Sequence, residues 1–257
     1  MCYDDQARPP EPPGSVGVAH GEDIVLTAQD GTQFAAYAAR PEQSSSTYVL
    51  IYPDVRGLHQ FYKELALRFA EIGIPAIAID YFGRTAGLTA RDESFDFWPH
   101  VEQVKFDSFV QDVQAALGFI RDASGEGAQV FVVGFCMGGT LTLLSGTRRE
   151  LGLTGLIPFY SGLSRDVDGQ GTALDRASKT AYPVLAHFGG DDQGIPQDQV
   201  QALDEQLDAA GVEHEVVVYP GAPHSFFDRR AEQFATESAQ AWQRSLEFIK
   251  AHTTQNS

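Results

Sequence analysis

The sequence predicts an α/β fold in which a mostly parallel, doubly wound sheet of about eight strands is flanked by helices. Along most of the chain, short apolar runs alternate with longer stretches whose apolar residues recur at helical spacing, which is the pattern of βαβ units. The first two apolar runs are instead separated only by a short segment containing Asp30-Gly31, a hairpin turn signal. In such a sheet the ligand site lies at the carboxyl ends of the parallel strands.

Eight short apolar runs account for the strands. They are predicted at residues 22–28, 33–39, 47–53, 75–80, 129–134, 153–159, 183–188 and 213–219. The first two form the antiparallel hairpin, and the later ones alternate with helices.

Three apolar stripes at helical spacing predict helices that face the core. They comprise Phe106, Phe109, Val110, Val113, Leu117 and Ile120; Val200, Leu203, Leu207 and Ala210; and Phe234, Trp242, Leu246 and Ile249. Residues 85–100 and 161–180 carry neither pattern and are expected to be loops. Loops of this length in a compact domain are functional or disordered.

The segment GFCMGG at residues 134–139 follows an apolar run and reads as a nucleophile elbow. A strand that enters a helix through this pattern turns so sharply that Cys136 takes a strained conformation, and the glycines leave room for the turn. The first N–H groups of the helix, beginning with Met137, are then placed to stabilise an oxyanion. An ordinary packing contact around a buried cysteine is the alternative for this segment alone.

Two later loops supply an acid and a base in the order that an elbow requires. Residues 189–196, GGDDQGIP, follow one predicted strand, and Asp192 is the preferred acid over its neighbour Asp191. Residues 220–227, PGAPHSFF, follow the last predicted strand and contain His224. An aspartate at such a place is alternatively a helix N-cap. The order Cys136, Asp192, His224 favours a catalytic triad.

With these three motifs, the chain resembles the dienelactone hydrolase (carboxymethylenebutenolidase) family of α/β-hydrolases, from about Ile24 to the last helix. The resemblance implies an α/β-hydrolase fold. It also implies that Asp54, where the family commonly has Glu, interacts with the thiol, and that the Val55 N–H is the second oxyanion donor. In that family, arginines bind a carboxylate of the substrate. Arg84 matches the first of these positions, whereas the second carries Asp228, followed by Arg229 and Arg230.

Further side chains are candidates for the substrate pocket. Tyr160 lies at a predicted strand end, and His59 follows the segment that carries Asp54 and Val55. The 85–100 loop contributes three aromatic residues, Phe95, Phe97 and Trp98. Tyr81 and Phe226 flank the Arg84 and His224 motifs. The aromatic residues of the loop serve equally well as packing against the domain.

Length, charge and cysteine content restrict the classes of function. Of the 257 residues, 1–20 are expected to form an extended arm and 21–257 a single domain. A net charge of −17 argues against nucleic acid and anionic membranes as partners. The N-terminus lacks an export pattern, and two distant cysteines do not indicate a disulfide framework, which favours the cytoplasm. No metal cluster or cofactor motif is visible, and monomer and homodimer both remain open.

These features predict acyl transfer to a thiol, with a small ester or enol lactone as substrate. A free cysteine is only a few per cent thiolate at neutral pH, so His224, supported by Asp192, must accept its proton. A general carboxylesterase or thioesterase acting on neutral acyl groups is the alternative within the same fold. A non-catalytic protein with a redox-sensing or ligand-binding Cys136 is the alternative from another class.

Overall fold

The computed structural model describes residues 6–14, 16–43, 45–125 and 127–253 and contains the predicted α/β fold. Eight strands form one sheet in the order β1-β2-β4-β3-β5-β6-β7-β8. Their bounds are β1 Ala19–Thr27, β2 Gln33–Pro41, β3 Thr47–Tyr52, β4 Ala76–Ile79, β5 Gln129–Phe135, β6 Gly155–Phe159, β7 Val184–Gly189 and β8 His214–Tyr219. Strand β2 pairs antiparallel with β1 and β4, and all other pairs are parallel.

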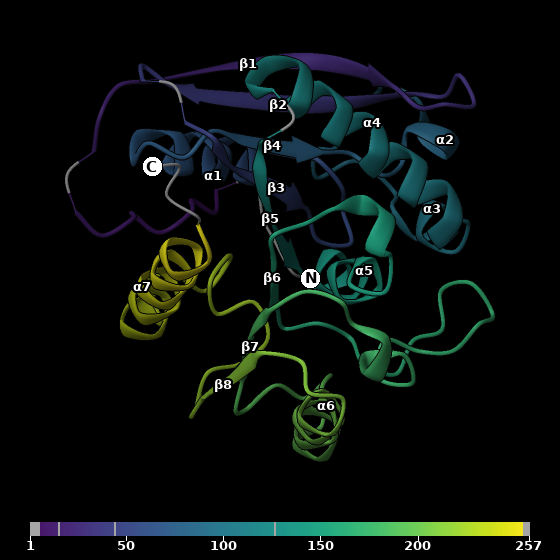
Figure 1. Ribbon diagram of the computed structural model, residues 1–257, viewed down its shortest axis with the longest axis vertical. Coiled ribbons are helices and arrows are strands. Elements are labelled where there is room, and N and C mark those ends of the chain that lie inside the picture. Colours follow the sequence, from purple (N-terminus) through teal and green to yellow (C-terminus); the bar gives the residue numbers. More distant parts are fainter. Residues whose placement is uncertain (1–5, 15, 44, 126, 254–257) are drawn as a thin grey trace.

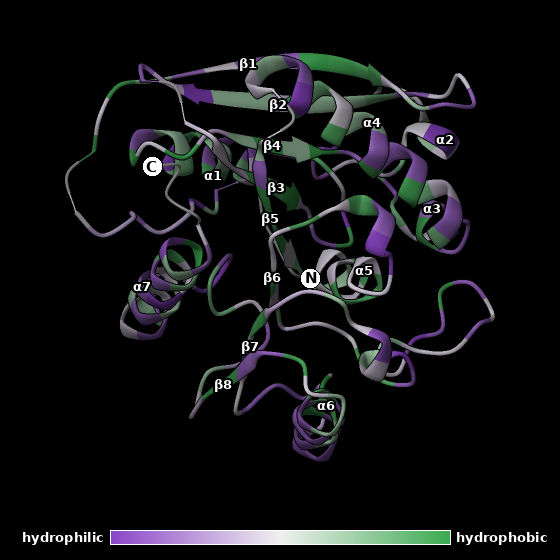
Figure 2. Cartoon of the chain, in the orientation of Figure 1, coloured by the Kyte–Doolittle hydropathy of each residue, from purple (hydrophilic) through white to green (hydrophobic). Residues whose placement is uncertain are grey.

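Helices cover both faces of this sheet (Figure 1). Helices α1 (Gln60–Glu71) and α7 (Ala235–His252) lie on one side, and α4 (Phe106–Ser124), α5 (Met137–Ser145) and α6 (Gln197–Ala209) lie on the other. In Figure 2, α6 and α7 carry both hydrophobic and hydrophilic residues, as expected for helices with one buried face. Among the described residues, no helix is both long and apolar enough to cross a bilayer.

The predicted apolar stripes are buried with three exceptions. All six members of the α4 stripe are buried, as are Val200, Leu203 and Leu207 in α6 and Trp242 and Ile249 in α7. Ala210 is exposed because α6 ends at residue 209. Phe234 precedes the first turn of α7, and Leu246 is only half-buried on that helix.

The segment predicted as the loop 85–100 contains regular structure. Helix α2 (Gly83–Ala86) extends into its beginning and α3 (Trp98–Val101) starts near its end. Two 3-10 turns, η1 (Arg149–Leu151) and η2 (Ala177–Lys179), complete the chain, and η2 lies within the 161–180 segment. Helices of four residues have too few apolar repeats to be recognised from sequence.

The described part of the N-terminal arm packs on the domain. Trp242 Nε1–H donates to the Pro10 carbonyl at 2.9 Å, and the Gly17 N–H donates to the Glu71 carbonyl at 2.6 Å. These contacts attach the arm to α7 and α1. Residues 1–5 lie outside the described residues.

Candidate active site

Strand β5 enters helix α5 at Cys136 through the sharp turn that the sequence predicts. Cys136 has a φ of 54° and a ψ of −112°, a combination that residues with a side chain rarely adopt. The glycines on either side are sterically required. A Cβ atom at Gly134 would lie 2.1 Å from Thr142 Oγ1, and one at Gly138 would lie 2.1 Å from the Pro53 carbonyl oxygen. Close packing therefore holds Cys136 in its strained conformation.

Two backbone N–H groups beside Cys136 have the chemistry of an oxyanion hole. Met137 is the first residue of α5, where the helix carries partial positive charge. Val55 belongs to the loop after β3, which lies against the same end of α5 because Gly138 packs on Pro53. In the described part of the chain, neither the Val55 N–H nor the Met137 N–H donates a hydrogen bond. Both amides can therefore serve an oxyanion.

His224 and Asp192 form a hydrogen-bonded pair. Nδ1 of His224 lies 2.7 Å from Oδ2 of Asp192, and the side chains are 29% and 1% exposed. Asp192 Oδ1 accepts the Gly194 N–H at 2.8 Å, which fixes the carboxylate in its loop. With a proton assigned to Nδ1 by this contact, Nε2 is the basic nitrogen of the imidazole. The structure thus pairs His224 with Asp192, whereas Asp191 is exposed.

Backbone hydrogen bonds bring the ends of neighbouring strands to one edge. The Cys136 N–H donates to the Phe159 carbonyl at 3.0 Å, and the Tyr160 N–H donates to the His187 carbonyl at 2.7 Å. Three non-glycine residues in the described chain have positive φ, namely Cys136 (54°), Tyr160 (35°) and Ser225 (62°). All three follow strands at the carboxyl edge, so backbone strain is concentrated around the candidate site.

Tyr160 and Phe226 support His224 from inside the protein. The Tyr160 and His224 rings lie 4.9 Å apart, and the Tyr160 hydroxyl donates to Asp228 Oδ2 at 2.8 Å. Phe226 packs 5.7 Å from the Tyr160 ring. Both aromatic side chains are fully buried. Their contacts hold the loop that carries His224.

Tyr81 and Trp98 occupy contrasting environments. Tyr81 is buried, and its hydroxyl donates to the Pro53 carbonyl at 3.2 Å. Pro53 begins the segment 53–59 between β3 and α1, which we call the oxyanion loop because it carries the candidate donor Val55. Trp98 is 60% exposed, and its ring lies 5.0 Å from that of Phe97. Tyr81 therefore supports the loop after β3 from inside the protein, whereas Trp98 lies on the surface at the start of α3.

Asp54 is a fully buried carboxylate directly after β3. Its Oδ1 accepts the Arg56 N–H at 2.9 Å and lies 3.6 Å from His59 Nε2. Its Oδ2 has no hydrogen-bond partner among the described residues. The His59 side chain is 2% exposed, so this histidine lies beneath the surface beside Asp54. A buried carboxylate oxygen without a partner is unusual, because most buried polar atoms are hydrogen-bonded.

Tyr62 is a buried tyrosine of α1 that lies within electrostatic range of both Asp54 and Asp228. Its hydroxyl is buried without a hydrogen-bond partner among the described residues. Burial, followed by the charges of Asp54 and Asp228 and the neighbouring Tyr160 and Tyr81, raises the pKa of Tyr62 well above its usual range. We call Asp54, Asp228, Tyr62 and Tyr160 the acidic cluster. It lies next to His224 and the oxyanion loop.

The guanidinium of Arg84 is directed to protein acceptors. It forms ion pairs with Asp30 and, at 2.7 Å, with Asp112, and it also donates to the Ser108 carbonyl at 3.1 Å. The hydrogen bond from Arg84 lowers the pKa of Asp30 to about 2. Burial raises the pKa of Asp112 to about 6, although Arg84 acts in the opposite direction. Arg84 thus links the β1–β2 turn, α2 and α4, which is not the arrangement expected of a substrate clamp.

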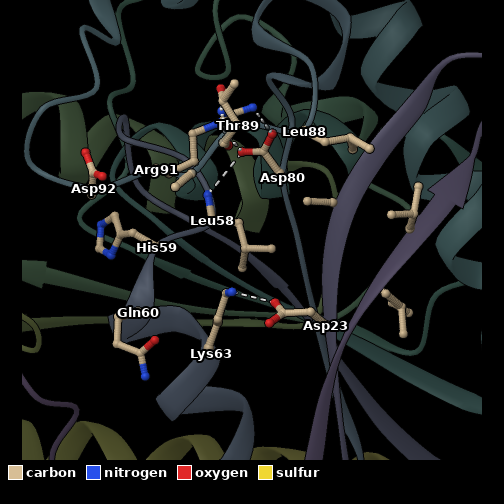
Figure 3. A pocket seen from close by; sticks show the side chains of 14 residues that line it. Asp23, Leu58, His59, Gln60, Lys63, Asp80, Leu88, Thr89, Arg91 and Asp92 are labelled. Carbon is tan, nitrogen blue, oxygen red and sulfur yellow. Dashed lines mark hydrogen bonds and ion pairs between the residues drawn. The ribbon is translucent and has the colours of Figure 1, made fainter.

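The oxyanion loop is held from behind by a buried ion pair (Figure 3). Asp80 Oδ1 accepts the Leu58 N–H at 3.1 Å, and Asp80 Oδ2 lies 2.8 Å from Arg91 Nη2. Gly57 has a φ of 83°, and a Cβ atom there would lie 2.6 Å from Asp80 Oδ1. Leu58, Asp80 and Arg91 border a cavity of about 570 Å³ that His59 also lines. The pair therefore fixes the loop that presents Val55.

Sequence reasoning did not select Tyr62, Asp80 or Arg91. Tyr62 belongs to the buried stripe of α1, where a core role is the simplest reading. Asp80 ends the predicted strand 75–80, and Arg91 lies 11 residues later in the expected loop. A carboxylate at the end of an apolar run is the one local signal that marks this ion pair.

A family model described as "Dienelactone hydrolase family" matches residues 34–253. A protein of Escherichia coli strain K12 named "Putative carboxymethylenebutenolidase" is 28% identical over 228 residues, covering 86% of this chain and 84% of that protein. The "Carboxymethylenebutenolidase" of Pseudomonas putida is 25% identical over 241 residues, covering 89% of this chain and 95% of that protein.

A solved structure agrees with these sequence matches. It is that of a "Putative Dienelactone Hydrolase" from Klebsiella pneumoniae, which superposes with a TM-score of 0.80 at 26% identity. The match covers 91% of this chain and 99% of that one. The predicted fold and family resemblance are therefore confirmed.

Proposed function

Because this chain belongs to the dienelactone hydrolase family, we propose that it hydrolyses a small carboxylic ester or enol lactone through a thioester on Cys136. The observation that carries the proposal is the His224–Asp192 hydrogen bond of 2.7 Å, formed at the sheet edge where Cys136 occupies a strained elbow. A nucleophile, a base and an orienting carboxylate at one edge are the requirements of triad chemistry.

In the first half of the reaction, His224 takes the proton of the Cys136 thiol, and the thiolate attacks the carbonyl carbon. The Val55 and Met137 N–H groups stabilise the negative charge that develops on the carbonyl oxygen. The C–O bond then breaks, and His224 returns its proton to the departing alkoxide. Asp192 holds the imidazole in the required tautomer. Asp54 adjusts the protonation of the Cys136 thiol before substrate binds.

In the second half, His224 takes a proton from a water molecule that attacks the thioester. The C–S bond breaks, the carboxylic acid departs, and His224 returns the proton to the departing thiolate, which regenerates the Cys136 thiol. Esters and enol lactones suit this two-step reaction because their alkoxide or enolate leaving groups compete well with the thiolate for expulsion from the tetrahedral intermediate. The proposed enzyme requires no metal or organic cofactor. A monomer and a homodimer are both compatible with this scheme, and we expect it to operate in the cytoplasm.

Hydrolysis of 4-nitrophenyl acetate and of a neutral enol lactone tests this proposal. We expect Cys136→Ala to lose at least about 1,000-fold in kcat, and His224→Ala to lose at least about 100-fold. Cys2→Ala is the matched control, since it removes the chain's other cysteine, and it should retain activity. Circular dichroism confirms folding of each variant.

A mass increase on brief incubation with an ester identifies the thioester directly. It should appear in His224→Ala or in rapidly quenched wild type and be absent from Cys136→Ala. Turnover that survives in Cys136→Ala would refute the cysteine mechanism. Absence of turnover on every ester, together with reversible oxidation of Cys136, would favour the redox-sensing alternative.

A further inference from the structure

On the basis of the function proposed above, we propose that the Tyr62 hydroxyl and Asp54 Oδ2 together bind a hydroxyl group on the acyl part of the substrate. Both atoms belong to the acidic cluster, and both are buried without a hydrogen-bond partner among the described residues. They are therefore not bonded to each other. The site should prefer esters or lactones whose acyl part carries a free hydroxyl group over the corresponding hydrocarbon substrates.

The hydroxyl of Tyr62 is not needed for the packing of α1. The other buried residues of this helix have hydrocarbon side chains, and Tyr62 itself is fully buried. A phenylalanine would fill the same space without an unpaired hydroxyl, and a buried hydroxyl that lacks a partner lowers stability. Because most buried polar atoms in proteins are hydrogen-bonded, this hydroxyl points to a role other than stabilising the fold.

The Asp54 carboxylate is held in one orientation, which leaves Oδ2 able to accept a further hydrogen bond. Its Oδ1 accepts the Arg56 N–H at 2.9 Å and lies 3.6 Å from His59 Nε2. Asp54 directly precedes Val55, the candidate oxyanion donor, in the oxyanion loop. The unpaired acceptor therefore belongs to the loop that would bind the carbonyl oxygen of the substrate.

Tyr62 and Asp54 are both neighbours of His59, whose ring centroid lies 5.1 Å from that of Tyr62. Burial, and next the charge of Asp54, raise the pKa of Tyr62 well above its usual range, as expected for a phenol close to that carboxylate. The Tyr62 ring also lies 5.5 Å from the ring of Phe135, the residue before Cys136. The two residues thus adjoin the nucleophile elbow and the oxyanion loop, where the acyl carbonyl group would bind.

A hydroxyl group matches the hydrogen-bonding capacity of this pair. An ionised carboxylate oxygen only accepts hydrogen bonds, a phenol can donate one, and an alcohol does both. The substrate hydroxyl would donate to Asp54 Oδ2 and accept from Tyr62, whereas a methyl group would leave both atoms unpaired. Sites with buried polar groups reject substrates that leave those groups unpaired. Because the bound group is uncharged, the preference does not require a particular net charge from Asp54, Asp228 and the buried Arg56.

Two pairs of esters in which a hydroxyl replaces a methyl group test the proposed preference. They are 4-nitrophenyl hydroxyacetate with 4-nitrophenyl propanoate, and 4-nitrophenyl 3-hydroxypropanoate with 4-nitrophenyl butanoate. Each kcat/KM is divided by the rate constant of spontaneous hydrolysis, which corrects for the inductive effect of the hydroxyl. We expect wild type to favour the hydroxyl ester by at least about tenfold in one pair or both.

Tyr62→Phe should narrow this preference by at least about fivefold, because the substrate hydroxyl loses one of its two partners. The same substitution should not lower the melting temperature, since the Tyr62 hydroxyl has no partner among the residues that the structure describes. This combination of results separates a role in substrate binding from a role in the fold.

Tyr182→Phe is the matched control, because the Tyr182 hydroxyl is satisfied by the protein itself. It donates to the Arg148 carbonyl at 2.8 Å and accepts the Gly152 N–H at 3.1 Å. Its loss should lower the melting temperature by about 2–4 °C. The preference for hydroxyl esters should stay at the wild-type value.

Absence of a preference in both pairs would overturn the proposal, as would a preference that Tyr62→Phe leaves unchanged. A Tyr62→Phe protein that does not fold, or that melts at a lower temperature and loses activity equally on both esters of a pair, would assign the hydroxyl to the fold instead. In each of these cases the proposed function stands, provided that Cys136→Ala abolishes turnover. Turnover of any of the four esters by Cys136→Ala would overturn the function itself.

Discussion

Arg91 and Asp80 form an ion pair that is almost completely removed from solvent, with Nη2 2.8 Å from Oδ2 and side-chain exposures of 2% and 0%. The same carboxylate accepts the backbone N–H groups of Leu58 and Phe82, each at 3.1 Å. One buried group thus joins the oxyanion loop, the end of β4 and the segment that carries Arg91. Stability and site geometry consequently depend on the same pair.

Arg91→Ala should lower the free energy of unfolding by about 3–5 kcal/mol, because it leaves the Asp80 charge buried without a counter-ion. Urea denaturation measures this change. Arg68→Ala is the control, since the Arg68–Glu71 pair is 33% and 23% exposed and its loss should cost less than about 1 kcal/mol. Equal effects of the two substitutions would contradict the structural role of the Asp80–Arg91 pair.

The elbow glycine Gly138 should not tolerate a side chain. A Cβ atom at this position would lie 2.1 Å from the Pro53 carbonyl oxygen and 2.2 Å from that of Tyr52. We therefore expect Gly138→Ala to destabilise the protein by at least about 2 kcal/mol and to lower kcat by displacing the oxyanion loop. Thermal denaturation and ester hydrolysis measure the two effects.

Gly118 provides the matched control for that substitution. It lies within α4, and nothing is within 4 Å of a Cβ atom built there. Gly118→Ala should stabilise the protein by roughly 0.5–1 kcal/mol, because alanine loses less backbone entropy than glycine in a helix. A Gly138→Ala protein with wild-type stability would show that the elbow relaxes at little cost.

The sequence was most informative where one local pattern determines the structure. The strands and the elbow follow from apolar runs and glycine spacing, and the residues of the three apolar stripes lie on α4, α6 and α7, except for Ala210 and Phe234. The order of acid and base after the nucleophile identified two side chains that the structure places in hydrogen-bond contact, Asp192 and His224. Such features depend on chain direction and on short-range geometry.

The environment of Arg84 could not be read in this way. Its partners are 54 residues earlier, at Asp30 in the β1–β2 turn, and 28 residues later, at Asp112 in α4. Neither distance in sequence predicts contact, because both depend on how the hairpin and the helix meet across the fold. The polar environment of the Tyr62 hydroxyl could not be predicted either. An apolar stripe at helical spacing indicates which side chains are buried, but not which polar atoms lie beside them.

Arg84→Ala should destabilise the protein more at pH 8 than at pH 5. Burial raises the pKa of Asp112 to about 6 even with Arg84 present. The folded state therefore retains a proton that the unfolded state loses between about pH 4 and pH 6, so the contribution of Asp112 to stability falls as the pH rises through this range. Without Arg84, the pKa of Asp112 rises further, so the contribution of Asp112 to stability continues to fall above pH 6.

Urea denaturation of wild type and Arg84→Ala at the two pH values measures the difference. We expect a cost of about 3 kcal/mol at pH 8 and clearly less at pH 5, where Asp112 is largely protonated. Asp30→Asn is the control, because it removes the exposed partner of Arg84 and should cost little at either pH. A pH-independent loss in Arg84→Ala would mean that packing, not the ion pair with Asp112, is the role of Arg84.

Acid should destabilise the protein through His187, the fully buried histidine of β7. The Ser245 hydroxyl donates to the Ala241 carbonyl at 2.7 Å, so its oxygen accepts His187 Nε2–H at 3.2 Å, and Nδ1 accepts the Tyr219 hydroxyl at 3.0 Å. The neutral imidazole is fully satisfied in this arrangement, whereas protonation would place a second donor on Nδ1. Burial, with a smaller effect of Arg244, lowers the pKa of His187 to about 3.

Between about pH 6.5 and pH 3 the unfolded state therefore binds a proton that the folded state does not. Stability contributed by His187 is complete above pH 6.5 and is lost as the pH falls through this range, by as much as about 5 kcal/mol. His187→Gln should lower stability at pH 7 but make it less dependent on pH between 6 and 4. His20→Gln, at a largely exposed site in β1, should keep the wild-type pH dependence. If His187→Gln retains the full acid-dependent loss, other groups are responsible for the acid sensitivity.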